Sequence, residues 1–175
     1  MRGKKQTGFT FVELLVVIAI IGVLTAVIIP YLQTARKKSR DTSRVANALI
    51  IQEALERYFD MNRSYPTSLG ALVPNYLPIL PKDPFSALGC VGFINCNFFY
   101  AYYPAGGPTY YHLGINLEQS GSQTQLLRDD KDCKSNGAVP ACPAGAVSYA
   151  DNFIGTDSAG CNLLSDRYCY DIVNK

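Results

Sequence analysis

The N-terminal part of the sequence constrains the fold most, because it holds a long and nearly uninterrupted apolar run. Residues 9–29 read FTFVELLVVIAIIGVLTAVII, in which Thr10, Glu13 and Thr25 are the polar side chains. A helix of this 21-residue length is ~30 Å long, which is about the thickness of the hydrocarbon core of a bilayer. The sequence therefore predicts one membrane-spanning helix near its start.

The charges around this run indicate its orientation. Arg2, Lys4 and Lys5 precede it, and basic residues beside a span favour the cytoplasmic side of the membrane. Four more basic residues, Arg36, Lys37, Lys38 and Arg40, follow the run and weaken that preference. The residues around Pro30 offer no small-x-small cleavage site, so the run does not resemble an ordinary secretory signal. We expect a single-pass protein or an exported precursor.

Glu13 argues against a simple anchor. A carboxylate costs ~2.5–3.5 kcal/mol near the centre of a membrane helix and less near the interface. A sequence that served only as an anchor would not carry it. In a lone subunit this side chain has no expected partner, and we expect it to remain at the level of the lipid headgroups.

The basic start, Gly8 and the run GFTFVELLVVIAIIGVLTAVIIP together resemble the N-terminal signature of type IV pilins and type II secretion pseudopilins. The resemblance implies that a prepilin peptidase cuts between Gly8 and Phe9 and methylates the new amino group of Phe9. Glu13 then becomes the fifth residue of the mature chain, the position of the family's assembly glutamate. Pro30 matches the proline that kinks the helix of the family.

The resemblance also implies the domain organisation. We expect an α+β, type IV pilin-like fold, in which a long helix packs on a small antiparallel sheet and a disulfide-stapled, irregular C-terminal region follows. Its parts are a leader peptide (1–8), a membrane and filament-core helix (9–30), an amphipathic continuation (31–62) and a globular head (63–175).

Assembly would give Glu13 the partner that it lacks in a lone subunit. Methylation keeps the positive charge of an amino group, so the N-terminus of a neighbouring Phe9 is a suitable partner. Such a pair would set the axial register between subunits, as buried polar groups do in coiled coils. Gly22 and Pro30 bracket the seven residues 23–29. This segment either follows a smooth proline kink, which we favour in a free subunit, or unwinds in a filament, as the family suggests.

Beyond the apolar run, apolar side chains at helical spacing from Val45 to Phe59 predict a helix face that lies on a sheet. We expect the basic side chains from Arg36 to Arg44 to form a solvated helix face that meets neighbouring subunits, with lipid binding as the alternative. Tyr65-Pro66 predicts the end of the helix. A short helix is expected near residues 68–73.

Aromatic residues and turn signals predict strands at residues 97–103, 109–117 and 167–173. In the second strand, alternation places Tyr111, Leu113, Ile115 and Leu117 toward the helix. His112 then falls on the outer face, where we expect it to be solvated.

Six cysteines in an exported chain indicate disulfides. They fall in three sequential couples, which predict the pairs Cys90–Cys96, Cys133–Cys142 and Cys161–Cys169. One alternative joins Cys161 or Cys169 to an earlier cysteine. Asp129, Asp130, Asp132 and Asp157 are weak candidates for calcium, because major pseudopilins bind that ion through a C-terminal acidic loop. A solvated acidic loop is the favoured interpretation, and we expect no cofactor.

The sequence indicates a structural protein. It holds one His and no Ser–His–acid set or phosphate loop, so we expect no enzyme. Without Arg2, Lys4 and Lys5, 13 basic residues face 14 acidic ones, which is not the footprint of a nucleic-acid binder.

The resemblance implies a subunit of a type IV pilus-like surface filament, with a secretion pseudopilin or a minor pilin acting as adhesin or DNA-uptake tip as alternatives. The implied partners are copies of the same chain, the prepilin peptidase, an inner-membrane assembly platform and, before assembly, membrane lipid. The implied location is the inner membrane with the head outside the cytoplasm, followed by an extracellular filament.

Overall fold

The computed structural model describes residues 8–84, 98–119, 130–156, 160–161 and 168–174. Contacts within the chain divide it into two compact units, Met1–Arg36 and Lys37–Lys175. The first unit holds the apolar run. The second holds the sheet and the irregular C-terminal region.

One helix, α1 (Phe11–Asn62), supplies the apolar run and continues through Pro30 into the second unit. It begins two residues later than Phe9, where the sequence predicted its start, because Thr10 caps its first turn. Its buried side chains lie between Asp41 and Leu55, so burial begins only in the second unit. The predicted end of the helix is confirmed, because Arg63 leaves the helical conformation with φ 56°.

The chain then runs beside α1 through a short 3-10 helix, η1 (Leu69–Leu72), close to the predicted short helix. The N–H group of Tyr65 donates a hydrogen bond to the carbonyl of Pro108, 2.7 Å away. This bond joins the helix exit to the turn between the first two strands. Leu69 and Leu72 are buried against the same core as α1.

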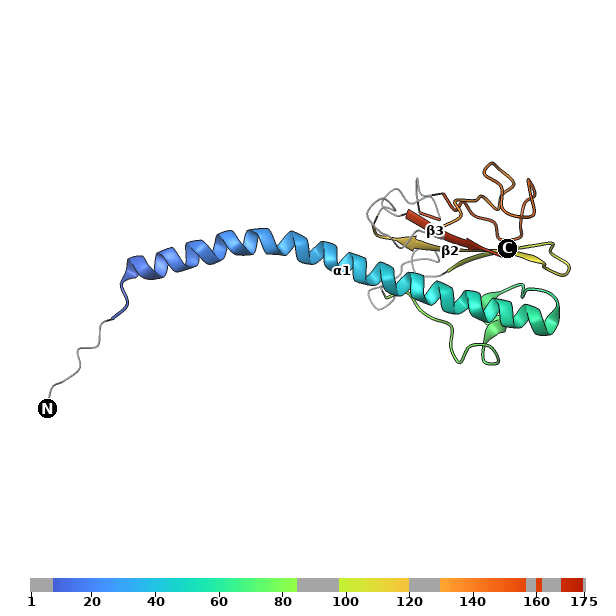
Figure 1. Cartoon of the computed structure of the whole chain (residues 1–175), viewed down its shortest axis with the longest axis horizontal. Coiled ribbons are helices and arrows are strands. Elements are labelled where there is room, and N and C mark those ends of the chain that lie inside the picture. The colour runs from blue at the N-terminus through green and yellow to red at the C-terminus, as the bar shows by residue number, and fades with distance from the viewer. Residues whose placement is uncertain (1–7, 85–97, 120–129, 157–159, 162–167, 175) are drawn as a thin grey trace. The chain divides into compact units, whose positions relative to one another are not determined.

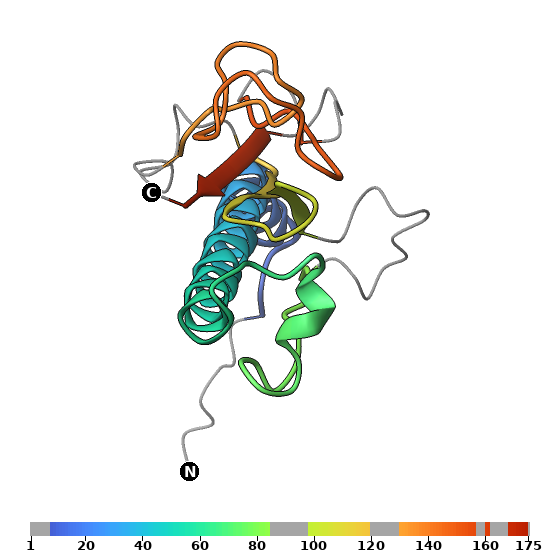
Figure 2. The ribbon, with the colours of Figure 1, turned by 90° about the vertical axis from the view of Figure 1, so that its right-hand side faces the viewer.

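The sheet has three antiparallel strands in the order β1 (Phe99–Tyr103), β2 (Tyr110–Leu117) and β3 (Tyr168–Val173). Ala101 lies opposite His112 in the first pair, and Leu113 lies opposite Ile172 in the second. In Figure 1, β2 and β3 run beside the C-terminal half of α1, and the irregular C-terminal segments, coloured orange, cover the other side of the sheet. Figure 2 shows the same order of layers from the end of the helix.

The inner face of the sheet and α1 form the main core. All four inner residues predicted for β2 are buried there, together with helix residues such as Ile51 and Leu55. Tyr170 and Ile172 extend this core onto β3. The predicted α+β, pilin-like fold, with a long helix packed on a small antiparallel sheet, is therefore confirmed.

The outer face of the sheet is also buried, and here the prediction for His112 was wrong. Its side chain is fully buried, and its ring stacks on Phe153 with centroids 3.8 Å apart. The irregular C-terminal region folds over this face and forms a second core. A Cβ atom at Gly114 would lie 2.4 Å from the ring of Phe153, so this close approach requires glycine.

Two disulfides hold the irregular region. They join Cys133 to Cys142 and Cys161 to Cys169, as the sequential pairing predicted. The alternative that joined Cys161 or Cys169 to an earlier cysteine is therefore not adopted. Cys90 and Cys96 lie outside the described residues.

Candidate processing and assembly site

The Gly8–Phe9 bond lies just before α1 in an exposed stretch. Residues 8–10 adopt neither helix nor strand, and Phe9 is 82% exposed. No heavy atom of the described residues lies within 4 Å of the position that a Cβ of Gly8 would occupy. The bond that the family resemblance marks for cleavage is therefore sterically open.

Glu13 and Thr10 form a capping box at the start of α1. The Oε2 atom of Glu13 accepts hydrogen bonds from the backbone N–H of Thr10 (2.8 Å) and from its hydroxyl (2.7 Å). The N–H of Glu13 points back to the Thr10 hydroxyl oxygen, 3.3 Å away. The expectation that Glu13 has no partner in a lone subunit was wrong, and the T-x-x-E spacing was the signal that would have found one.

The N-terminal part of the helix, from Phe11 to Ile29, exposes mostly apolar side chains. Among the described residues, α1 is the one helix long and apolar enough to cross a membrane, with a mean hydropathy of 3.0 in a window of which none is buried. Val12, Ile18, Val23 and Val27 each expose more than half of their surface. A surface of this kind needs lipid or other apolar helices around it.

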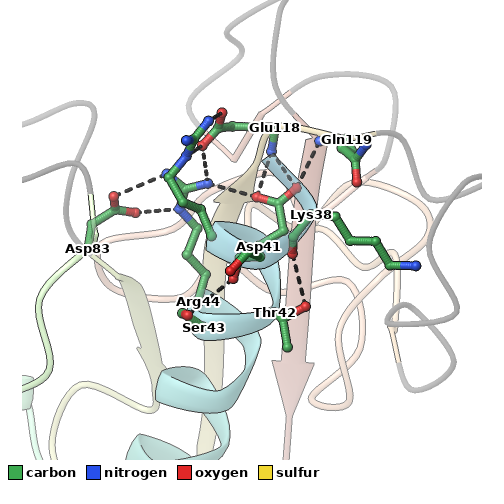
Figure 3. A network of polar contacts seen from close by, with 10 residues as sticks. Lys38, Asp41, Thr42, Ser43, Arg44, Asp83, Glu118 and Gln119 are labelled. Atoms are coloured by element: carbon green, nitrogen blue, oxygen red, sulfur yellow. Dashed lines mark hydrogen bonds and ion pairs between the residues drawn. The ribbon is translucent and has the colours of Figure 1, made fainter. Parts of the chain in front are cut away.

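The second unit carries a polar network where α1 meets the sheet (Figure 3). The Nε and Nη2 atoms of Arg44 donate to both carboxylate oxygens of Asp83, at 2.7 and 3.1 Å. Its Nη1 atom donates to Asp41 and to Glu118, each at 2.7 Å. Arg40 binds the same Glu118 carboxylate.

The carboxylate of Asp41 also accepts hydrogen bonds from the backbone N–H groups of Glu118 and Gln119, each at 3.0 Å. Asp41 thereby caps the chain just after β2. The network joins α1, the connector at Asp83 and the end of β2. The prediction that the basic side chains form a solvated helix face was therefore wrong for Arg44, which is 3% exposed. Sequence reasoning also gave no role to Asp41, Asp83 or Glu118.

Burial and charge act against each other in this network. Burial alone would lower the pKa of Arg44 and raise that of Glu118. The ion pairs outweigh burial, so the pKa of Arg44 rises and that of Glu118 falls to about 2. Both groups therefore stay charged at neutral pH.

A second buried polar cluster lies on the outer face of the sheet. Asp171 of β3 accepts the N–H of Asp132 at 2.9 Å and lies 3.0 Å from Nε2 of His112. The N–H of Asp171 donates to Asp130 at 2.9 Å. Burial lowers the pKa of His112 to about 3 and, with a neighbouring carboxyl, raises that of Asp130.

These contacts give two of the four calcium candidates, Asp130 and Asp132, a role in tying their segment to β3. Asp129 and Asp157 lie outside the described residues. Calcium binding by this set stays a prediction.

The family model described as the prokaryotic N-terminal methylation motif matches residues 3–29. The type II secretion system core protein G of Aeromonas hydrophila is 32% identical over 101 residues, which cover 48% of this chain and 71% of that protein. The chain belongs to the pilin and pseudopilin family.

Other relatives come from both branches of this family. The core protein G of Escherichia coli is 39% identical over 97 residues, 46% of this chain and 67% of that protein. The type IV wide pilus major component PilA4 of Thermus thermophilus is 45% identical over 83 residues, 47% of this chain and 62% of that protein. No solved structure matches at a significant level.

Membership confirms the resemblance drawn from the N-terminal residues. The members of this family are structural subunits. Membership therefore implies processing by a prepilin peptidase and assembly with other subunits into a filament. The exposed apolar helix and the methylation motif fit anchoring in a membrane followed by such assembly.

Proposed function

We propose that this pilin-family chain is a structural subunit that is cut between Gly8 and Phe9 and methylated on Phe9. The observation that carries the proposal is the exposed apolar helix that begins two residues after this bond. Removal of residues 1–8 leaves the helix on the mature chain. Residues 9–30 then anchor the subunit in the membrane and later pack in the filament core, residues 31–62 continue the helix, and residues 63–175 form the head.

Assembly exchanges one partner of Glu13 for another. In the single chain its carboxylate accepts two hydrogen bonds from Thr10. The methylated amino group of a neighbouring Phe9 offers a full positive charge, which binds a carboxylate more strongly than a neutral donor does in an apolar surrounding. The exchange becomes favourable once neighbouring helices exclude water and lipid headgroups. Gly22 and Pro30 supply the weak points at which the helix adjusts to its neighbours.

The favoured filament is a type IV pilus-like structure at the cell surface. The pilus component PilA4 is 45% identical over the region it shares with this chain, against 32% and 39% for the core proteins G named above. The disulfides of the head suit a filament that works outside the cell.

A pseudopilus of a type II secretion system is the second candidate. Most of the similar curated proteins are named as its core protein G, and one shares 71% of its length with this chain. In either filament the subunit works with copies of itself, the prepilin peptidase and an inner-membrane assembly platform, and it meets membrane lipid before assembly. A minor pilin at a filament tip is the remaining alternative.

Deletion of the gene that encodes this chain distinguishes the three candidate functions. For a surface pilus, electron microscopy of the deletion strain shows loss of the filaments while secreted proteins still reach the medium. For a pseudopilus, secreted proteins accumulate in the periplasm and any surface pili remain. For a minor tip subunit, filaments persist but lose adhesion or DNA uptake.

A further inference from the structure

A groove of about 520 Å³ lies between α1 and β3 in the head. Leu49, Gln52 and Glu56 of α1 form one wall, and Tyr170 and Ile172 of β3 contribute to the other. Leu49 is apolar and yet 48% exposed. Among the described residues that line the groove, Glu56 is the acidic one. A lysine side chain fits such a groove, because its methylene stem lies on apolar surface while its ammonium group binds a carboxylate.

Two tyrosines orient the carboxylate of Glu56. The hydroxyl of Tyr65 donates a hydrogen bond to Oε2 at 2.9 Å, and that of Tyr111 donates to Oε1 at 3.0 Å. Both donors are neutral, so they leave the negative charge of Glu56 unbalanced. Lys131 also lines the groove, but no ion pair joins it to Glu56 among the described residues. The carboxylate is thus held in place while it lacks a cationic partner in the described part of the chain.

The same helix carries a matching cation, Lys38, which is exposed. Figure 3 shows its side chain extending away from the buried network, in which Arg40 and Arg44 are bound to Glu118. Lys38 and Glu56 lie 18 residues apart in the chain. This separation is about five turns of helix, so the two residues share one side of α1 at a distance of ~27 Å. They cannot meet within one chain.

We propose that the groove beside Glu56 receives the Lys38 side chain of a second copy of this chain, displaced by ~27 Å along the helix axis. The inference rests on the proposed function as a filament subunit. Each copy offers its groove to one neighbour and its Lys38 to another, and a head-to-tail contact of this kind repeats into an open filament. The opposite charges fix the register of the contact. Phe9 and Glu13 lie only four residues apart, so their pairing joins a subunit to a different neighbour.

Zero-length cross-linking of wild-type filaments tests this contact directly. Filaments sheared from the cell are treated with a water-soluble carbodiimide, which joins an amine to a carboxylate only where the two touch, and the linked peptides are identified by mass spectrometry. We expect an amide bond between Nζ of Lys38 and the carboxyl group of Glu56. Because these groups lie ~27 Å apart in one chain, the bond forms only between copies. Filaments that lack it overturn the inference and leave the proposed function intact, whereas an absence of filaments that contain the chain contradicts both.

Variants test whether the contact holds the filament together. Lys38→Met and Glu56→Gln each remove one charge, and the glutamine keeps an acceptor for the two tyrosine hydroxyls. We expect both variants to insert normally in the membrane and to lose most of the sheared filaments, while Lys38→Arg keeps them. Lys82→Met is the matched control, because Lys82 is an exposed lysine outside α1. Wild-type yield from Lys38→Met or Glu56→Gln overturns the proposal, as does an equal loss in the control or a cross-link from Lys38 to Glu53 or Asp60 in place of Glu56.

Discussion

Thr10 and Glu13 hydrogen-bond to each other in both directions at the first turn of α1. This reciprocal contact satisfies the carboxylate while the subunit stands alone. It also gives the N-terminal helix a defined start two residues after the proposed cleavage point. Assembly therefore begins from a subunit whose Glu13 is already hydrogen-bonded, and the new partner in the filament has to be the stronger one.

Glu13→Gln tests the charge at this position. The amide removes the negative charge that would bind a neighbouring amino group, so we expect normal membrane insertion and a loss of filaments, measured as sheared subunit per cell. Thr10→Val is the matched control, because it removes the hydroxyl of the cap and keeps the carboxylate. It should still form filaments. Normal filament yield from Glu13→Gln would show that the charge is not required.

Gly8→Arg tests the cleavage site. A large charged side chain beside the scissile bond should exclude the chain from the peptidase, so we expect the uncut, unmethylated precursor in the membrane by mass spectrometry. Gly22→Ala serves as control, because no heavy atom of the described part of the chain lies within 4 Å of its Cβ position and the bond is remote from it. The control chain should be cut. A Gly8→Arg chain that still begins at Phe9 would contradict the assignment.

Arg44→Met tests the buried network. The change leaves Asp41, Asp83 and Glu118 without the cation that binds all three, so we expect the free energy of unfolding to fall by about 3–5 kcal/mol. Urea unfolding followed by the tyrosine signal of the head measures it. Arg57→Met is the control, because its ion pair with Glu53 is exposed and contributes about 0.3–0.5 kcal/mol. Equal losses in the two variants would rule out a special role for the network.

Acid should weaken the same network through Glu118. Its pKa falls from 4.5 to about 2 on folding, so the unfolded chain binds the proton more readily. The stabilising contribution is complete above the unfolded value of 4.5 and is lost as the pH falls toward 2. We expect the unfolding midpoint in urea to decrease across this window. Glu118→Gln should be less stable at neutral pH and show a shallower decrease, and an unchanged slope would contradict this origin.

The sequence predicted the long helix and the sheet because both follow simple periods. Apolar side chains recur at helical spacing along α1, and the strict alternation in β2 placed Leu113 and Ile115 in the core. The N-terminal motif could also be recognised from the sequence, because its residues are adjacent in the chain.

The remaining features depend on contacts between distant segments. His112 is buried because a region without regular period folds over the outer face, and only glycine at position 114 hinted at that close approach. Arg44 looked like one more basic residue near the membrane, while its partner Asp83 lies 39 positions away. A pairing of that separation leaves no local pattern in the sequence.

The mass of the subunit in filaments sheared from the cell tests the central claim most directly. The account predicts a chain that begins at Phe9, carries one added methyl group at its N-terminus and retains the whole apolar helix. A filament subunit that begins after Pro30, or that still carries residues 1–8, would contradict it.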